Sequence, residues 1–190
     1  MKTKKCKICK EPFIPVRPLQ ICCSPTCAMT HARNKGAKAT AEKYRREART
    51  RRQAINDLRP TSYYIRHAQS ALNRYVRLRD KDQGCISCDK PSSWYGQWHA
   101  SHFRPAGNNS AIRFNLWNIH KSCSICNNWK SGNLAEYEPN LRVKIGDAKV
   151  DWLKSQTQSA KYNKEYLERL KKVFTKKANR LERRQKEASG

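Results

Sequence analysis

The chain of 190 residues has few acidic residues and no long hydrophobic segment. Only 15 residues are Asp or Glu against 41 Lys or Arg, so the formal net charge is +26. No apolar run approaches the roughly 18 residues of a membrane-spanning helix, and the basic N-terminus is not followed by the apolar segment of a signal peptide. We therefore expect neither a membrane protein nor a secreted one. So large a positive charge predicts a polyanionic partner, with nucleic acid favoured over an anionic membrane surface.

Apolar residues are also scarce, at 37 % of the chain, so any hydrophobic core must be modest. Cysteine occurs nine times, and eight of the nine fall into four pairs separated by two or three residues. Such pairs are typical of zinc sites, whereas a disulfide framework would need an oxidising compartment. We predict about two structural zinc ions per chain, which would add folding free energy that apolar burial lacks, and a reducing, cytoplasmic location.

The first two cysteine pairs predict a small zinc ribbon at residues 1–29. Three prolines among residues 12–18 exclude a long helix in this segment. The third ligand is either Cys22 or Cys23, and we favour Cys23 because Cys-Ser-Pro-Thr-Cys resembles the second knuckle of many small ribbons. The predicted ligands are Cys6, Cys9, Cys23 and Cys27.

Residues 30–58 are rich in Lys and Arg, and their few apolar residues are mostly Ala. Such a segment cannot bury a face, so tertiary packing will not hold it as a helix. We expect a basic arm that is helical when bound to phosphates, with a solvated linker as the alternative. The arginines expected to contact nucleic acid here are Arg45, Arg46, Arg49, Arg51 and Arg52.

Two amphipathic helices are predicted in the rest of the chain. The first runs from a cap at Thr61 or Ser62 to about Asp80. The second, which is basic on its polar side, covers about 159–187 within the C-terminal segment 157–190. The apolar faces of both could pack within one chain or form a dimer surface. The apolar residues at helical spacing in the first helix are Ile65, Ala68, Leu72, Tyr75 and Val76.

The segment 59–156 contains the other two cysteine pairs and all five tryptophans. We expect its aromatic side chains to pack in a small core rather than to stack on bases. One short helix is expected on each side of Gly146. The second zinc site is predicted at Cys85, Cys88, Cys123 and Cys126.

Three polar residues lie between and just after these cysteine pairs: His102, Asn118 and Asn127. His102 and Asn118 are separated by 15 residues, and Asn127 directly follows the last cysteine. This arrangement resembles the HNH nuclease motif in its zinc-stapled form. The resemblance implies a small α+β fold with a ββα core, in which a strand ends at His102, a loop carries Asn118 and a helix opens at Asn127. Long basic helices would accompany this core.

The same resemblance implies a hydrolytic chemistry. Cleavage of a phosphodiester needs a base that is neutral at about pH 7, and His102 would take a proton from water. A divalent cation, Mg²⁺ or Mn²⁺, would bind the scissile phosphate and stabilise the departing 3′ oxygen. Asn118 would hold the loop and orient the imidazole by a hydrogen bond, and Asn127 would bind the cation through its carbonyl oxygen.

One position departs from the HNH pattern. HNH proteins often have an acidic residue or a His directly before the base, where this chain has Ser101, a poor metal ligand. His99 could serve instead, but on a regular strand His99 and His102 face opposite sides, so a bulge or turn would be needed. His120 is expected to be a structural or surface residue.

The resemblance extends beyond the motif to several short segments. They are Arg-Pro-Thr-Ser-Tyr at 59–63, Trp-His-Ala-Ser-His at 98–102, Ile-Arg-Phe-Asn at 112–115 and Lys-Ser-Gly-Asn-Leu at 130–134. Together with the ribbon and the basic arm, they resemble the phage NinG family, also called Rap, over nearly the whole chain. In that family's pattern, Asp and Gly occupy the positions of His99 and Ser101. The resemblance implies a recombination endonuclease of lambdoid-type phages that cuts branched DNA, such as Holliday junctions and D-loops, in the host cytoplasm.

Three basic residues of the motif, Arg104, Arg113 and Lys130, are expected to contact phosphates near the scissile bond. No helix is expected to present a mixed Asn, Gln and Arg face for reading bases, so we predict recognition of DNA shape rather than of sequence. A symmetric junction would suit a homodimer. Two alternatives are a non-catalytic, zinc-dependent DNA-binding recombination mediator and a sequence-specific HNH nuclease.

Overall fold

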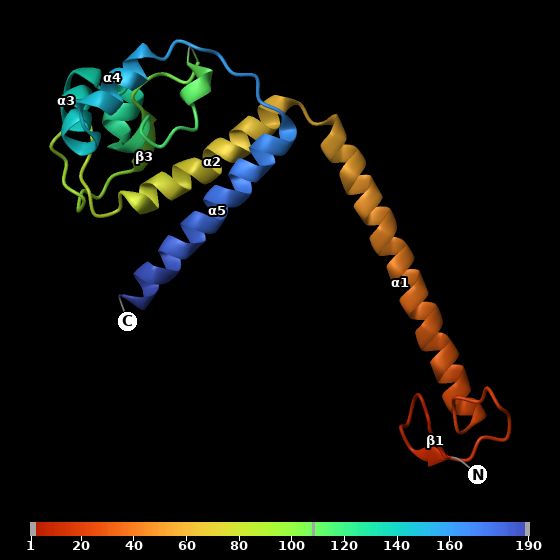
Figure 1. The fold of residues 1–190 in the computed structure, drawn as a ribbon. Coiled ribbons are helices and arrows are strands. Elements are labelled where there is room, and N and C mark those ends of the chain that lie inside the picture. The colour runs from red at the N-terminus through yellow and green to blue at the C-terminus, as the bar shows by residue number, and fades with distance from the viewer. Residues whose placement is uncertain (1–2, 108, 189–190) are drawn as a thin grey trace. The chain divides into compact units, whose positions relative to one another are not determined.

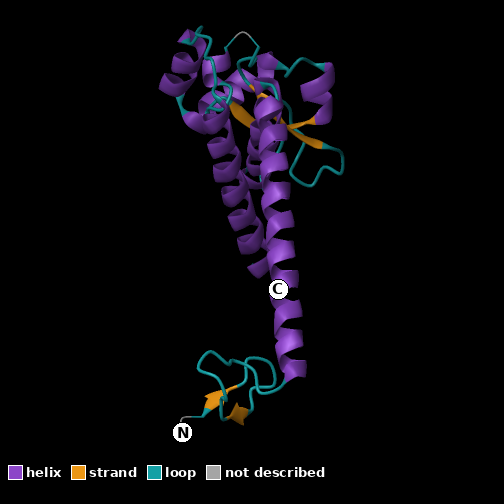
Figure 2. Cartoon of the chain, turned by 90° about the vertical axis from the view of Figure 1, so that its right-hand side faces the viewer, coloured by secondary structure: helices purple, strands orange, loops and turns teal. Residues whose placement is uncertain are grey.

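The structure, a computed structural model, describes residues 3–107 and 109–188. As predicted, the protein is a small α+β protein, and in the described part helices predominate over two sheets of two strands each (Figure 2). The chain forms two compact units, one ending at Arg59 and the next beginning at Pro60 (Figure 1). None of the helices in the described ranges is both long enough and apolar enough to span a membrane.

The first unit consists of a short hairpin followed by one long helix. Strands β1 (Lys4–Lys5) and β2 (Pro12–Phe13) pair antiparallel. Helix α1 (Pro25–Leu58) begins where the Ser24 hydroxyl accepts a hydrogen bond of 3.2 Å from the Cys27 N–H. Ser at the N-cap and Pro at the first helical position both favour a helix start. The helix therefore begins inside the predicted ribbon, between two of its cysteines.

Helix α1 is continuous over 34 residues, and none of its residues is buried. The sequence predicts an arm that tertiary packing does not hold and that is helical when it binds phosphates, and the structure shows the segment as one helix. Its residues are largely Ala, Arg, Lys and Glu, which have high helix propensity, and no proline follows Pro25 before the helix ends. Local propensity and the capped N-terminus therefore maintain this helix without tertiary packing.

The second unit contains the remaining elements. Its α-helices are α2 (Thr61–Arg79), α3 (Leu134–Ile145), α4 (Asp147–Ser155) and α5 (Lys164–Glu187). Its strands are β3 (Trp98–His102) and β4 (Ile119–Cys123), and two short helical turns are η1 (Ser110–Ile112) and η2 (Ile125–Trp129).

Helices α2 and α5 lie side by side (Figure 1). Lys164 lies over the Tyr64 ring near the start of both helices, and further along Arg74 pairs with Glu182 at 2.6 Å, so the two helices run in the same direction. Their apolar faces pack on one another and form a core within the chain. Tyr64, rather than the predicted Ile65, belongs to the buried stripe. The buried residues of the two helices in this core are Tyr64, Ala68, Leu72, Val76, Leu167 and Phe174.

The starts of both helices differ from the prediction. Helix α2 follows Pro60 without a side-chain cap, so the predicted cap at Thr61 or Ser62 is wrong. Helix α5 begins at Lys164 rather than at about 159, because the Asn163 side chain accepts a main-chain N–H of the first turn at 2.8 Å. Capping by a specific side chain, rather than the onset of apolar periodicity, sets this boundary.

Strands β3 and β4 form a regular antiparallel hairpin. Five residues of each strand pair without a bulge, so that His102 lies opposite Ile119. Ala100 and Ile119 lie on the face that packs against α2 and α5. The other face contacts α3, where the His120 ring lies against Tyr137. The hairpin is therefore held between two layers of helices.

The helix after the hairpin begins later than the motif predicts. Asn127 lies in the single π-helical turn η2 and not at the start of a continuing α-helix. Ser131, Gly132 and Asn133 then have positive φ angles of 48°, 92° and 50°, which a right-handed helix does not allow. Helix α3 begins only at Leu134. The order strand, strand, helix is present, with an irregular segment before the helix.

Helices α3 and α4 lie on either side of Gly146, as predicted. Gly146 has a φ of 88°, a conformation that favours glycine, and its N–H donates to the Arg142 carbonyl at 2.8 Å. The two helices contribute to a second apolar core next to the hairpin. Its buried members are Ile86, Phe103, Ile112, Tyr137, Leu141, Val150 and Leu153.

A buried carboxylate connects α2 to the hairpin. Asp80, directly after α2, is 2 % exposed and accepts hydrogen bonds of 2.8 and 2.7 Å from Arg79. It also accepts the main-chain N–H of Lys121 in β4 at 3.2 Å and pairs with Lys144 at 3.2 Å. Burial alone would raise the pKa of Asp80, but these partners, Arg79 first, lower it to about 2. His120, beside this carboxylate, is a structural residue, and burial lowers its pKa to about 3.

Candidate functional site

Four cysteines of the first unit converge on one point. The sulfur atoms of Cys6, Cys9, Cys23 and Cys27 all lie within 4.8 Å of one another. The Cys23 sulfur is 3.5 Å from that of Cys9 and 3.7 Å from that of Cys27. A tetrahedral zinc ion with Zn–S bonds of about 2.3 Å places its sulfurs about 3.8 Å apart, so this group fits one zinc ion. Its four members are the ligands predicted from the sequence.

Cys22 lies next to this group and outside it. It is buried, and its burial, followed by the negative charge of Cys6, raises its pKa. Cys6 shows the opposite behaviour: burial would raise its pKa, but main-chain N–H groups, that of Cys23 first, lower it to about 5. Cys23 is thus the third member of the group, and Cys22 packs as a small buried residue.

A second group of four cysteines holds the end of the hairpin to the loop after α2. Cys85 and Cys88 lie in that loop, Cys123 ends β4 and Cys126 lies in η2, with all four sulfurs within 4.8 Å of one another. The Cys123 N–H donates to the Cys85 sulfur at 3.2 Å, and the Cys126 N–H donates to the Cys123 sulfur at 3.4 Å. Such donors stabilise thiolates. The protein therefore has two groups that can each bind a zinc ion, as predicted.

His102 ends β3 with one ring nitrogen fixed by a hydrogen bond. Its Nε2 lies 2.9 Å from the main-chain carbonyl oxygen of Arg113. Because a carbonyl oxygen only accepts, Nε2 carries the proton and Nδ1 is left as an acceptor. Burial, aided by the positive charge of Arg113, lowers the pKa of His102, so the ring is neutral at about pH 7. A neutral imidazole with a free nitrogen can accept a proton.

Asn118 supports the loop around this histidine. It is fully buried; its Oδ1 accepts the Arg104 N–H at 2.7 Å, and its Nδ2 donates to the carbonyls of Arg104 and Ile112 at 3.1 and 3.3 Å. The sequence predicts a direct hydrogen bond from Asn118 to the His102 ring, but the ring bonds instead to the Arg113 carbonyl. Asn118 therefore acts on His102 only through the loop that it holds.

His99 and Asn127 contact each other. The Asn127 Nδ2 lies 3.1 Å from Nδ1 of His99 and 3.0 Å from Oδ1 of Asn128. His99 Nε2 lies 3.3 Å from the Gln97 side-chain oxygen, so Nε2 is the donor of this ring and Nδ1 the acceptor. Two acceptors thus point at the Asn127 amide. Turning that amide round would place its own oxygen between them, and three acceptors would converge, as a divalent cation requires.

The two histidines lie on opposite faces of β3, because the strand is regular and side chains alternate. The bulge that would bring His99 to the face of His102 is not formed. The structure therefore joins His99 to Asn127 on one face and leaves His102 with the Arg113 carbonyl on the other. Positions 101 and 99 are one and three residues before His102, so both face away from it. An acidic residue at position 101 would therefore face the same way as His99.

The outer edge of β3 lies between the His102 ring on one face and the His99–Asn127 contact on the other. The Phe103 N–H donates to the Asn118 carbonyl at 2.8 Å, which sets the phase of the antiparallel ladder. With this phase, the main-chain N–H groups of Ala100 and His102 point away from β4. Neither has a hydrogen-bond partner among the residues that the structure describes. The edge thus offers N–H donors between a neutral imidazole and a cluster of acceptors.

The three basic residues predicted near the scissile bond differ in their environments. The Arg113 guanidinium donates to the Ala106 carbonyl at 3.3 Å, and its Nε, like that of Arg104, is buried without a partner in the described ranges. Lys130 is exposed at the end of η2, next to Trp129, which is 83 % exposed. The expectation that every aromatic residue here packs in the core is therefore wrong for Trp129.

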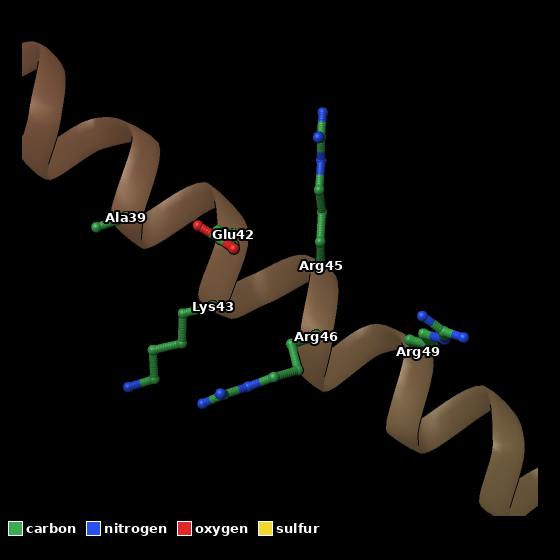
Figure 3. A pocket seen from close by; sticks show the side chains of 6 residues that line it. All are labelled: Ala39, Glu42, Lys43, Arg45, Arg46 and Arg49. Atoms are coloured by element: carbon green, nitrogen blue, oxygen red, sulfur yellow. The ribbon is translucent and has the colours of Figure 1, made fainter.

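The predicted arginines of the basic arm all lie on α1. Figure 3 shows Lys43 and Arg46 extending to one side of this helix and Arg45 extending to the other. The helix carries nine Lys or Arg residues against three acidic residues, a net charge of +6. Because none of its residues is buried, all of these charges are accessible to a polyanion. A shallow hollow on its surface is lined by Ala39, Glu42, Lys43, Arg45, Arg46 and Arg49.

Helix α2 carries a polar face that the sequence prediction missed. Arg66, Gln69, Asn73 and Arg77 follow one another at helical spacing beside the buried stripe. This face mixes Arg, Gln and Asn, a combination that was not predicted on any helix; recognition of DNA by shape rather than by sequence stays a prediction. These four residues are separated by three, four and four positions, the same period as the apolar stripe. This spacing in the sequence could have revealed the polar face.

Comparison with known proteins identifies relatives along the whole chain. The family described as bacteriophage lambda NinG protein matches residues 1–185. Protein ninG of Escherichia phage 933W is 36 % identical over 98 % of this chain and 97 % of its own length. The proteins named ninG from Escherichia phage lambda and Salmonella phage P22 share the same identity over the same fractions of both chains. No solved structure matches this chain at a significant level.

Proposed function

Because this chain belongs to the NinG family of bacteriophage proteins, we propose that it is a metal-dependent DNA endonuclease of branched recombination intermediates, such as Holliday junctions and D-loops. The observation that carries this proposal is the state of His102, a neutral imidazole with a fixed Nε2–H and a free Nδ1. This is the state of a general base that takes a proton from water. The net charge of +26 provides the attraction to DNA.

His102 acts as the base, and its environment supports each stage of the proton transfer. Before the reaction, its lowered pKa keeps the ring neutral at about pH 7. When Nδ1 takes the proton, the Arg113 carbonyl at 2.9 Å from Nε2 stabilises the imidazolium and keeps the ring from turning. Asn118 holds the loop that positions this carbonyl through its hydrogen bond to the neighbouring Ile112.

His99, Asn127 and Asn128 are the residues that would hold the divalent cation. Their acceptors already converge on the Asn127 amide, and one ring nitrogen with two amide oxygens can bind a metal ion. The chemistry supplied by Mg²⁺ or Mn²⁺ held there would be neutralisation of charge on the scissile phosphate and the departing oxygen. The set contains no carboxylate, so phosphate oxygens and water would have to supply the remaining ligands.

We place the scissile phosphate at the outer edge of β3. The N–H groups of Ala100 and His102 point outward there and can donate to phosphate oxygens. A phosphate in this position has the His102 ring on one side of the strand and the His99–Asn127 pair on the other. The opposite orientation of the two histidines is therefore compatible with a single site that spans the edge of the strand.

The alternative is a DNA-binding recombination mediator that needs zinc and does not cut. The observation in its favour is that, in the part of the chain that the structure describes, no carboxylate joins His99 and Asn127 in a metal-binding group. Among the described residues, the only sets of three or more Cys, His, Asp or Glu side chains placed to bind a metal are the two cysteine groups. Both functions need the same positive charge and the same zinc-stabilised fold, so only cleavage separates them.

Two further features belong to the proposal. A homodimer would present two equivalent sites to a symmetric four-way junction. The protein would act in the host cytoplasm, because that compartment is reducing and keeps all eight zinc-binding cysteines as thiols or thiolates.

The test is a cleavage assay with the zinc-loaded full chain. A four-way junction and a linear duplex of the same sequence are incubated with Mg²⁺ or Mn²⁺, or without either ion. We expect nicks near the branch that depend on the added ion and few nicks in the duplex. His102→Ala should bind the junction normally but cut it at least about 100-fold more slowly, which is the usual contribution of a general base.

The matched control is His31→Ala, a histidine of the first unit outside the proposed site. It should cut at the wild-type rate. If the wild type and His102→Ala yield the same products at the same rate, His102 is not the base. If the wild type binds junctions and never nicks them with either ion, the non-catalytic function is correct.

A further inference from the structure

The polar face of α2 and the Arg113 side chain form a groove of about 300 Å³. Ile65 also lines it, and the polar residues that line it are Arg66, Gln69, Ser70, Asn73, Arg77 and Arg113. Arg66 and Arg77 are 11 positions apart on α2, or about 16 Å at 1.5 Å per residue, so the groove is an extended strip rather than a spherical pocket. No acidic residue lines it.

The arginines of this groove have no counter-ions in the described ranges. Two other arginines close to them in α2 are used in the fold: Arg74 pairs with Glu182 and Arg79 pairs with Asp80. By contrast, Arg66, Arg77 and Arg113 form no ion pair within the described residues. Three guanidinium groups gathered without a carboxylate favour a negatively charged ligand.

Buried polar atoms on the groove residues also lack partners. The Nε of Arg113 is buried with no acceptor, and the side-chain oxygen of Gln69 is buried with no donor, among the residues that the structure describes. The Gln69 amide nitrogen donates to Asn73 at 2.8 Å, which leaves the Asn73 amide nitrogen available. Leaving a buried polar atom unpaired is costly, so a ligand that supplies an acceptor to Arg113 would relieve this cost.

The groove and the candidate site share one residue, Arg113. Arg113 contributes its side chain to the groove, while its main-chain carbonyl holds Nε2 of His102 at 2.9 Å. His102 also lies on the face of the hairpin that packs against α2, the face of Ala100 and Ile119. A strand that lies in the groove would therefore contact the residue whose carbonyl holds the proposed base.

We propose that this groove binds consecutive backbone phosphates of the DNA strand that leads to the scissile bond. The inference rests on the proposed function and adds the residues that position the strand. The arginine forks match phosphate oxygens, and the amides of Gln69 and Asn73 with the Ser70 hydroxyl add neutral hydrogen bonds. Because these contacts are to phosphates, they position the strand and do not read its sequence.

The test measures junction binding without added Mg²⁺ or Mn²⁺. The full-length protein is zinc-loaded and carries His102→Ala, so that cleavage cannot contribute. The double variant Arg66→Ala/Arg77→Ala should bind more weakly at every salt concentration. The slope of log affinity against log salt should be smaller by about 1.8, since each lost phosphate contact removes about 0.9. Arg66→Gln/Arg77→Gln, which removes both charges but keeps polar side chains that can donate hydrogen bonds, should lose the same salt slope.

The matched control is Lys171→Ala/Lys172→Ala, which removes two exposed charges from α5 outside the groove. If the groove binds phosphates, the arginine variants lose clearly more affinity and slope than this control. If both double variants weaken binding equally, the groove adds only general charge and the inference is wrong. Zinc content and helicity equal to those of the parent establish that each variant is folded.

These outcomes separate the groove from the nuclease proposal. A wild-type protein that cuts junctions, together with arginine variants that bind like the control, refutes the groove alone. A wild-type protein that never cuts, together with arginine variants that lose affinity, refutes the nuclease and leaves the groove as a DNA-binding surface. A wild-type protein that neither binds nor cuts the junction, together with a parent variant that does not bind it at low salt, would refute both.

Discussion

Replacement of Cys23 by Ser should remove one zinc ion from the protein, whereas replacement of its neighbour Cys22 by Ser should remove none. The Cys23 sulfur lies 3.5 Å from that of Cys9 and 3.7 Å from that of Cys27, within the first cysteine group. Cys22 is buried and lies outside that group. The two substitutions are adjacent and chemically identical, so any difference between them reports membership of the metal site.

The expected consequence for folding is large and local. In the described part of the first unit, only Cys6 and Cys22 are buried, so the hairpin of β1 and β2 has no apolar core of its own. A structural zinc ion contributes an apparent binding free energy of about 10–16 kcal/mol, which exceeds what two buried side chains can provide. Loss of this ion should unfold residues 4–24. The second unit, with two apolar clusters, should remain folded.

Elemental analysis of dialysed protein and hydrogen exchange are the assays. Cys23→Ser should contain one zinc ion per chain instead of two, and its amides between 4 and 24 should exchange freely while those of the hairpin β3–β4 stay protected. Cys22→Ser should keep two ions and a protected ribbon. Two ions and a protected ribbon in Cys23→Ser, or loss of zinc in Cys22→Ser, would refute the assignment of Cys23 as the ligand.

Two further predictions concern titrating groups. The pKa of Asp80 is lowered from 3.8 to about 2, so its charge stabilises the fold above about pH 4, and this contribution is lost as the pH falls through about 2. Asp80→Asn should therefore lower the free energy of unfolding at about pH 7 by roughly 2 kcal/mol or more. Urea denaturation measures this change. An unchanged midpoint would mean that Arg79 and Lys144 find other partners. Burial lowers the pKa of His102, so the rate of junction cleavage should fall to half its maximum only at a pH below the ordinary value of about 6.5. A rate already halved at about pH 6.5 would contradict a neutral, buried base.

Much of the metal chemistry could be predicted from the sequence, because it depends on local spacing. The intervals within each cysteine pair allow both sulfurs of the pair to reach one ion, and both groups of four are those expected. The apolar period of α2 and the two helices around Gly146 were predictable for a similar reason, since helix period and glycine breaks are properties of short segments.

The candidate site was only partly predictable, because its geometry depends on pairing between distant segments. The sequence indicated His102, Asn118 and Asn127. It predicted a hydrogen bond between the His102 ring and Asn118, whereas the ring bonds to the Arg113 carbonyl. A main-chain acceptor leaves no mark in the side-chain pattern. The contact of His99 with Asn127, 28 residues apart, depends on the hairpin register together with η2.

The amino-acid sequence by itself determined the charge of +26, the two cysteine groups and the amphipathic helices, because composition and short-range spacing act before the chain folds. Only the tertiary structure decided that α2 and α5 run parallel with their apolar faces together. It also decided that a polar strip of α2 meets Arg113 beside His102. The physical reason is that each of these arrangements requires segments about 40 to 100 residues apart to share one packed surface, and long-range packing of this kind is not contained in any local pattern.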